Sequence, residues 1–342
     1  MPTPNPSVNR RDFLAATAAG AGLAALPTGT VWAKPTATTA VATPESLVKL
    51  LHESFSPRQR ETLCFAWDAK GPGGGPLRRN VNANWQITDP ALNDDFFNDE
   101  QRELVRAIFE GIYNPEWHER IDRQLDEDAG GFGESNSIAI FGEPGSDRCE
   151  FVMTGRHMTV RCDGNTTPHF AFGGPIFYGH DASETPDHEG NVFWPQGLAA
   201  NELYQMLDNE QRDAALVRDN MPRENRVKFR KLTPYQGIPV AQLSGDQQEH
   251  LRGVLNKLVE PYRTSDQEEA LDCLAGQRHD GHSGLDACHL AYYEEGDLGG
   301  DGVWDNWRLE GPSFVWHYRG NPHVHVWVNV ADDPTAKITT HG

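Results

Sequence analysis

The chain has 342 residues, with 30 basic and 50 acidic side chains and a formal net charge of −20. So acidic a surface repels phosphate backbones and anionic headgroups, which argues against nucleic acid or a membrane surface as a partner. Hydrophobic residues make up 37% of the chain and include nine Trp and fifteen Phe. That content is low but sufficient for the core of one large domain.

The first residues of the chain have the pattern of an export signal. Residues 9–14 read Asn-Arg-Arg-Asp-Phe-Leu, a twin-arginine motif, and a weakly apolar stretch rich in Ala and Gly follows to Leu26. The small residue at the end of Val31-Trp32-Ala33 fits a cleavage site. We therefore predict a removable twin-arginine (Tat) signal over residues 1–33 and a periplasmic or extracellular mature protein.

The sequence after the signal favours one domain, because no low-complexity linker follows Pro44. We predict a flexible mature N-terminus over residues 34–44 and a single compact domain over residues 45–335, with two lobes as the alternative. Because no later segment reaches the roughly 18 consecutive apolar residues of a membrane helix, we expect no membrane insertion.

Four short motifs predict where helices begin. Each places a capping side chain three residues before a Gln, at residues 56–59, 98–101, 208–211 and 244–247. This is the spacing of a capping box, in which the cap and the Gln each bond the other's backbone N–H. The recurrence could come from an ancient duplication, but unrelated helices also carry such caps, so the motifs do not establish an internal repeat.

Strand patterns fall in two later groups. Alternating and β-branched residues bounded by Gly and Pro lie between residues 137 and 178, and again at residues 290–293 and 307–330. Helices at the front, and helices between the two groups of strands, predict an α+β fold. In this fold the helical N-terminal part packs on a mainly antiparallel sheet.

Two histidines on one strand are the clearest candidates for chemistry. Side chains alternate along a strand, so His323 and His325 project from the same face. His317 precedes both, and Asn321-Pro322, which lies between His317 and His323, predicts a turn. A five-residue loop would pair His317 with His323 on that face, whereas a four-residue loop would place His317 on the opposite face.

The chain has five cysteines, which are Cys64, Cys149, Cys162, Cys273 and Cys288. A two-residue turn at Gly155-Arg156 would place Cys149 opposite Cys162, and an oxidising compartment would permit a disulfide there. The sequence leaves the pairing of the five open.

Several motifs together resemble the family known as domain of unknown function 3500. They occur in the family's order over most of the mature chain: residues 128–133 (Asp-Ala-Gly-Gly-Phe-Gly), 139–145 (Ala-Ile-Phe-Gly-Glu-Pro-Gly), 154–159 (Thr-Gly-Arg-His-Met-Thr), 171–180 (Ala-Phe-Gly-Gly-Pro-Ile-Phe-Tyr-Gly-His), 310–312 (Glu-Gly-Pro) and 322–325 (Pro-His-Val-His). The family name implies no activity, so the resemblance supports the choice of residues rather than a reaction.

The chain departs from the family pattern at two places. Where many members have Gly-His-His, this chain has Gly155-Arg156-His157, which keeps the second histidine. The family pattern also has an acidic residue near the position of His317, which puts His317 in doubt as a ligand.

These observations predict a metal site. We expect His157, His323 and His325 to converge, with His180 or His317 as a fourth ligand. Imidazole ligands suit Zn, Cu, Fe or Mn, and the sequence does not rank these metals. The first functional hypothesis is a metalloenzyme with redox or Lewis-acid chemistry on a small or saccharide-like substrate. The alternative is an extracytoplasmic protein that binds a metal or small ligand without turnover. The sequence does not indicate the oligomeric state.

Overall fold

The structure is a computed structural model. It describes residues 42–72, 74–164, 170–181, 191–219, 221–223, 227–229, 234–297, 303–336 and 339–340. The predicted signal peptide lies outside the described residues. The chain divides into two units, Met1–Thr43 and Pro44–Gly342, and the second is compact. None of the described helices combines the length and apolarity that a membrane span requires.

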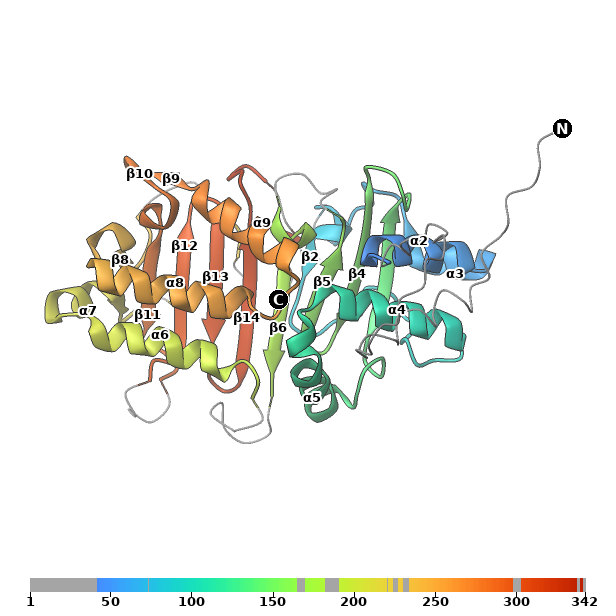
Figure 1. The fold of residues 1–342 in the computed structure, drawn as a ribbon, viewed down its shortest axis with the longest axis horizontal. Helices are drawn as coiled ribbons and strands as arrows, with labels where there is room; N and C mark the ends of the chain where they lie inside the picture. The colour runs from blue at the N-terminus through green and yellow to red at the C-terminus, as the bar shows by residue number, and fades with distance from the viewer. Residues whose placement is uncertain are drawn as a thin grey trace, which may run out of the picture. The chain divides into compact units, whose positions relative to one another are not determined.

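A long mixed sheet forms the centre of the second unit (Figure 1). Eleven strands of the described part belong to it, in the spatial order β1 (Cys64–Phe65), β3 (Ser137–Gly142), β4 (Cys149–Gly155), β5 (Met158–Cys162), β6 (Ile176–His180), β14 (Val324–Val330), β13 (Phe314–Arg319), β12 (Asn306–Gly311), β11 (His289–Tyr293) and β7 (Leu216–Val217), with β8 (Ile238–Pro239) also on β11. From β3 to β11 all neighbours are antiparallel, and β1 and β7 pair parallel at the two edges. Short pairs form between β2 (Asn80–Val81) and β15 (Thr339–Thr340), and between β9 (Arg278–His279) and β10 (His282–Ser283).

Four of the described helices begin where the capping motifs predict. The α-helices are α2 (Pro44–Ser54), α3 (Pro57–Leu63), α4 (Asp99–Ile112), α5 (His118–Ala129), α6 (Trp194–Met206), α7 (Asn209–Ala215), α8 (Gly245–Val259) and α9 (Thr264–Ala275). Single turns of 3₁₀ helix are η2 (Leu77–Arg79), η3 (Pro115–Trp117), η4 (Ala171–Gly173), η5 (Val240–Gln242) and η6 (Gly284–Ala287). All four predicted capping boxes are formed, at the starts of α3, α4, α7 and α8. With the sheet, these helices confirm the predicted α+β class.

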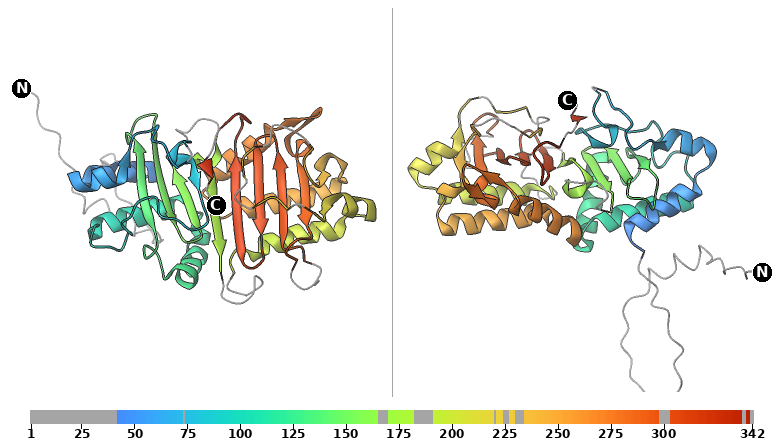
Figure 2. Two further views of the ribbon diagram at one scale, coloured as in Figure 1. Left: turned by 180° about the vertical axis from the view of Figure 1, so that it is seen from behind. Right: turned by 90° about the horizontal axis from the view of Figure 1, so that it is seen from above.

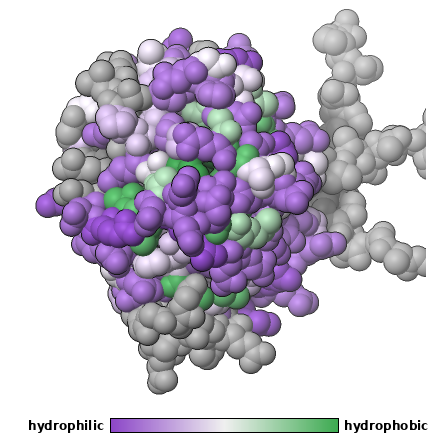
Figure 3. Space-filling model, turned by 90° about the vertical axis from the view of Figure 1, so that its left-hand side faces the viewer, coloured by the Kyte–Doolittle hydropathy of each residue, from purple (hydrophilic) through white to green (hydrophobic). Residues whose placement is uncertain are grey.

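The long helices lie against one face of the sheet, as the views from behind and from above show (Figure 2). Tyr178 of β6 donates to Gln196 of α6 at 2.8 Å, which ties the sheet to this layer. The opposite face carries separate apolar clusters, one around Phe177, Val315 and Trp327. The end of the molecule beyond β11 is mainly hydrophilic (Figure 3), as the excess of acidic residues predicts.

The two halves of the sheet repeat one arrangement, which the sequence did not predict. In each half a seven-residue capped helix runs directly into a two-residue strand, α3 into β1 and α7 into β7. That strand pairs parallel with the first of four consecutive antiparallel strands, β3 to β6 or β11 to β14. The cap glutamines also repeat, since Gln59 and Gln101 exchange amide hydrogen bonds and Gln211 and Gln247 do the same. The halves meet where β6 pairs with β14.

The turn between β4 and β5 is one residue further along than expected. Gly155 pairs with Met158, so Arg156 and His157 form the turn and Cys162 lies opposite Phe151 rather than Cys149. The turn assumed at Gly155-Arg156 is therefore wrong, and Cys149 does not lie opposite Cys162. All five cysteines lie in the described part of the chain, and no disulfide joins any of them.

Candidate metal centre

His157 occupies the tight turn between β4 and β5. Its φ of 51° is left-handed, a conformation that costs energy for a residue with a side chain, and its backbone N–H donates to Ala83 O at 2.8 Å. This conformation is part of the turn that joins the two strands. The turn therefore fixes the position from which the His157 side chain extends, at the end of the β4–β5 hairpin.

Gly179 of β6 makes room for the histidines to meet. His325 of β14 lies directly opposite Gly179, and Met158 lies opposite Tyr178, so the register carries His157 to the other side of Gly179. A Cβ at Gly179 would stand 2.3 Å from Val324 O and 3.4 Å from the His325 ring. Glycine is therefore required here, and its missing side chain leaves space over the middle strand.

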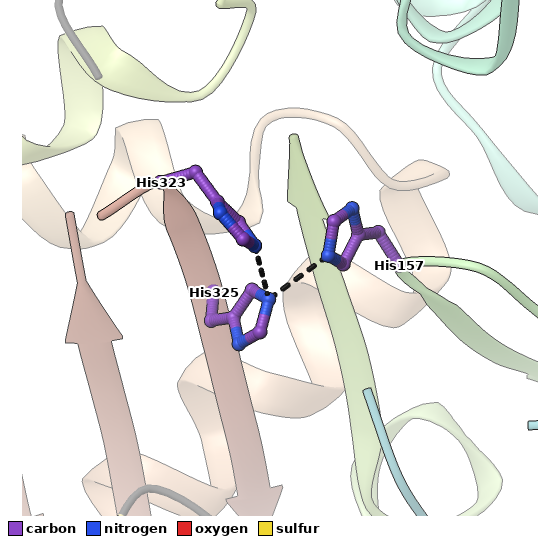
Figure 4. Close-up of side chains that lie close together, drawn as sticks. All are labelled: His157, His323 and His325. Atoms are coloured by element: carbon purple, nitrogen blue, oxygen red, sulfur yellow. Dashed lines mark hydrogen bonds between the residues drawn. The ribbon is translucent and has the colours of Figure 1, made fainter. Parts of the chain in front are cut away.

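Three imidazoles meet in that space (Figure 4). His325 Nε2 lies 2.8 Å from His323 Nε2 and 2.9 Å from His157 Nε2. Each residue offers a ligand atom, and these atoms lie within 4.8 Å of one another. A first-row ion with bonds of about 2.0–2.1 Å separates its nitrogen ligands by roughly 3 Å. The two distances from His325 are close to this value.

The cluster is buried on one side and open on another. His157 is 5% exposed and His325 is 9% exposed, whereas the His323 side chain is 23% exposed. Burial lowers the pKa of His323, and the neighbouring His157 lowers it further. A lowered pKa favours the neutral imidazole, which is the form that binds a metal.

Two aspartates and an arginine lie behind the imidazoles. Asp128 of α5 accepts a hydrogen bond from His157 Nδ1, and its other oxygen accepts from Arg156 Nε at 2.9 Å. Arg156 also donates to Asp181 at 3.0 Å, and Asp181 lies 3.8 Å from His323 Nδ1. Burial alone would raise the pKa of Asp128, but the His157 hydrogen bond and the charges of His157 and Arg156 lower it overall. Asp128 is therefore a carboxylate at neutral pH.

The sequence reasoning did not identify these three residues as part of a site. Asp128 lies in the first motif of the family resemblance, which was the available signal, but no spacing relates it to a histidine 29 residues away.

The comparison with known families agrees with the motifs. A family profile described as "Protein of unknown function (DUF3500)" matches residues 34–330. The chain belongs to the DUF3500 family. No curated protein and no solved structure matches it significantly. Membership supports the resemblance stated from the motifs and assigns no activity.

In this DUF3500 chain, His180 does not join the cluster. It lies opposite Val324 in the β6–β14 ladder, so its side chain is on the other face of the sheet from His325. Its Nδ1 accepts from the Val192 N–H at 3.3 Å, and its Nε2 lies 3.2 Å from a Glu127 carboxylate oxygen. The expectation of His180 as a fourth ligand is not supported, because alternation along β6 turns the ring away.

His317 is also outside the cluster, for a different reason. It shares the face of His325 but lies opposite Trp327, because β13 continues to Arg319 before the chain turns. Neither expected loop register is formed. The fully buried His317 ring accepts from Arg308 Nε at 3.3 Å. Burial lowers its pKa well below the usual value, with Arg308 and Arg319 lowering it further.

Proposed function

We propose that this DUF3500 protein is an exported metalloprotein that binds one transition-metal ion through His157, His323 and His325. The observation that carries the proposal is the convergence of the three Nε2 atoms. Three neutral imidazoles suit Zn, Cu, Fe or Mn, and neighbouring carboxylates of the kind found here are typical of metal-binding histidines.

A catalytic role is the first form of the proposal. Three protein ligands leave a coordination position for water or a substrate, as in catalytic rather than structural zinc sites. The partial exposure of the His323 side chain supports an open position on the solvent side of the cluster. A bound ion would supply Lewis-acid or redox chemistry to a small or saccharide-like substrate. The chain's own residues would hold the ion and orient its ligands.

The alternative is binding without turnover. His325 Nε2 lies at hydrogen-bond distance from both other rings, an arrangement that a shared proton also satisfies. In this form the three histidines bind a metal or small ligand, and no substrate is converted. Retention of metal without exchangeable water at the ion favours this form.

Metal titration of protein purified without a histidine tag tests the proposal. We expect about one equivalent of Zn²⁺, Co²⁺ or Cu²⁺ to bind per chain, because the cluster can surround one ion. Inductively coupled plasma mass spectrometry and calorimetry measure the content and the affinity. Protein that remains free of metal under stoichiometric loading would contradict the proposal.

Export through the Tat pathway is a separate part of the proposal. It is supported by Arg10 and Arg11 in the sequence, which lie outside the described residues. Replacing both arginines with lysine should leave the precursor in the cytoplasm, because paired arginines are the recognition feature of this signal. Fractionation with N-terminal sequencing checks the result, and the secreted wild-type chain should begin near Lys34. Unchanged secretion of the double variant would argue for another route.

A further inference from the structure

We infer that Asp128 is a positioning residue of the metal centre, whose carboxylate holds His157 with its proton on Nδ1 and its bare Nε2 directed at the ion. The inference rests on the proposed metal site and extends it to a residue outside the ligand set.

The hydrogen bond decides which ring nitrogen of His157 is bare. A neutral imidazole has one N–H, and a carboxylate can accept that hydrogen but cannot donate one. Because Nδ1 faces Asp128, the proton lies there and the Nε2 lone pair points toward His325. The ring nitrogen of a metal-binding histidine that does not bind the ion usually donates its hydrogen to a carboxylate, a carbonyl or a water.

The place of Asp128 in its helix argues for this role. Asp128 lies in the last turn of α5, and a carboxylate there meets the negative end of the helix dipole. Its side chain is fully buried. Neither the dipole nor burial favours an aspartate at this point. Its side chain is held by hydrogen bonds from His157, Arg156 and Gln124, and of these three residues only His157 belongs to the proposed ligand set.

Arg156 extends the same arrangement to a second ligand. Its guanidinium joins the carboxylates of Asp128 and Asp181, and these face Nδ1 of His157 and of His323. Two of the three rings thus have a carboxylate behind them, held by one shared cation. Arg156 is 37% exposed at its side chain, so this link lies at the rim of the site.

The test compares Asp128→Asn with Asp126→Asn, an exposed aspartate of the same helix. Nitrogen-15 NMR of His157 in metal-free protein should report the Nδ1–H tautomer in the wild type and in Asp126→Asn. In Asp128→Asn the ring should shift toward the Nε2–H form. Metal affinity should fall about 10- to 100-fold in Asp128→Asn, the range found when the hydrogen-bond partner of a metal-binding histidine is removed.

A second variant separates positioning from simple ion pairing. Arg156→Gln removes the ion pair but leaves the Asp128–His157 hydrogen bond, so it should keep the Nδ1–H tautomer. An unchanged tautomer and affinity in Asp128→Asn would overturn the inference while leaving the metal site intact. A wild-type protein that binds no metal would overturn the proposed function. The role of Asp128 at a metal ion would then be overturned too. A tautomer shift in Asp128→Asn would in that case show that Asp128 orders a hydrogen-bonded histidine cluster.

Discussion

Replacing His325 with alanine is expected to abolish metal binding and the stability that the metal adds. Its Nε2 contacts both other ligand nitrogens, so the variant leaves two rings without their central partner. A ligand that binds the native state alone stabilises it by about 2.7 kcal/mol at a hundredfold excess over its dissociation constant. Thermal denaturation with and without added Zn²⁺ should therefore show a metal-dependent rise in Tm for the wild type and none for His325→Ala.

The matched control is His282→Ala, because His282 is exposed in the β9–β10 pair and lies outside the cluster. This variant should keep the full metal response, and a chelator should reverse it. Binding should also weaken as the pH falls below roughly 6.5, because protons compete for the imidazoles. A His325→Ala protein that is stabilised by Zn²⁺ as strongly as the wild type would contradict the proposed ligand set.

Replacing Glu150 with alanine is expected to cost about 3–5 kcal/mol of folding free energy, the loss found when one partner of a buried ion pair is removed. Glu150 is fully buried in β4 and accepts from Arg78 at 3.0 Å and from Arg161 at 2.9 Å. Arg161 is buried too, so the variant leaves cationic groups in the interior without their anion. Burial raises the pKa of Glu150, and the two arginines oppose that shift.

Urea denaturation measures this loss, with Glu143→Ala as the control because Glu143 is exposed just after β3. The control should change the unfolding free energy by less than about 0.5 kcal/mol, the usual range for surface positions. If Glu150→Ala lost no more stability than Glu143→Ala, the ion cluster would not contribute as described.

The parts of the structure that depend on neighbouring residues were predicted correctly. A capping box closes within four residues, so Ser56 with Gln59 and Ser244 with Gln247 form wherever the tertiary structure permits a helix. The expectation that the His323 and His325 side chains share a face is equally local, and their rings do meet, although His323 lies just before β14 rather than within it. Membership of the DUF3500 family could also be stated from short motifs, because their order along the chain is a property of the sequence.

Several features that the sequence did not decide depend on which residues pair across neighbouring strands, because a turn of different length or position changes every pair that follows it. A shift of one residue at Arg156 moved Cys162 away from Cys149, and the length of β13 placed His317 opposite Trp327. The repeat of the two halves became visible through strand order and the glutamine pairs, since four short caps alone also fit unrelated helices.

The site itself shows the same division between local and tertiary causes. The sequence by itself determined which histidines are candidates, because their spacing and motifs are local. The contact between His325 and His157 spans 168 residues, and the Asp128 partner comes from a helix that no periodicity relates to either strand. Only the sheet decided that they meet, because β6 places Gly179 between the two histidines and its lack of a side chain leaves space for the rings.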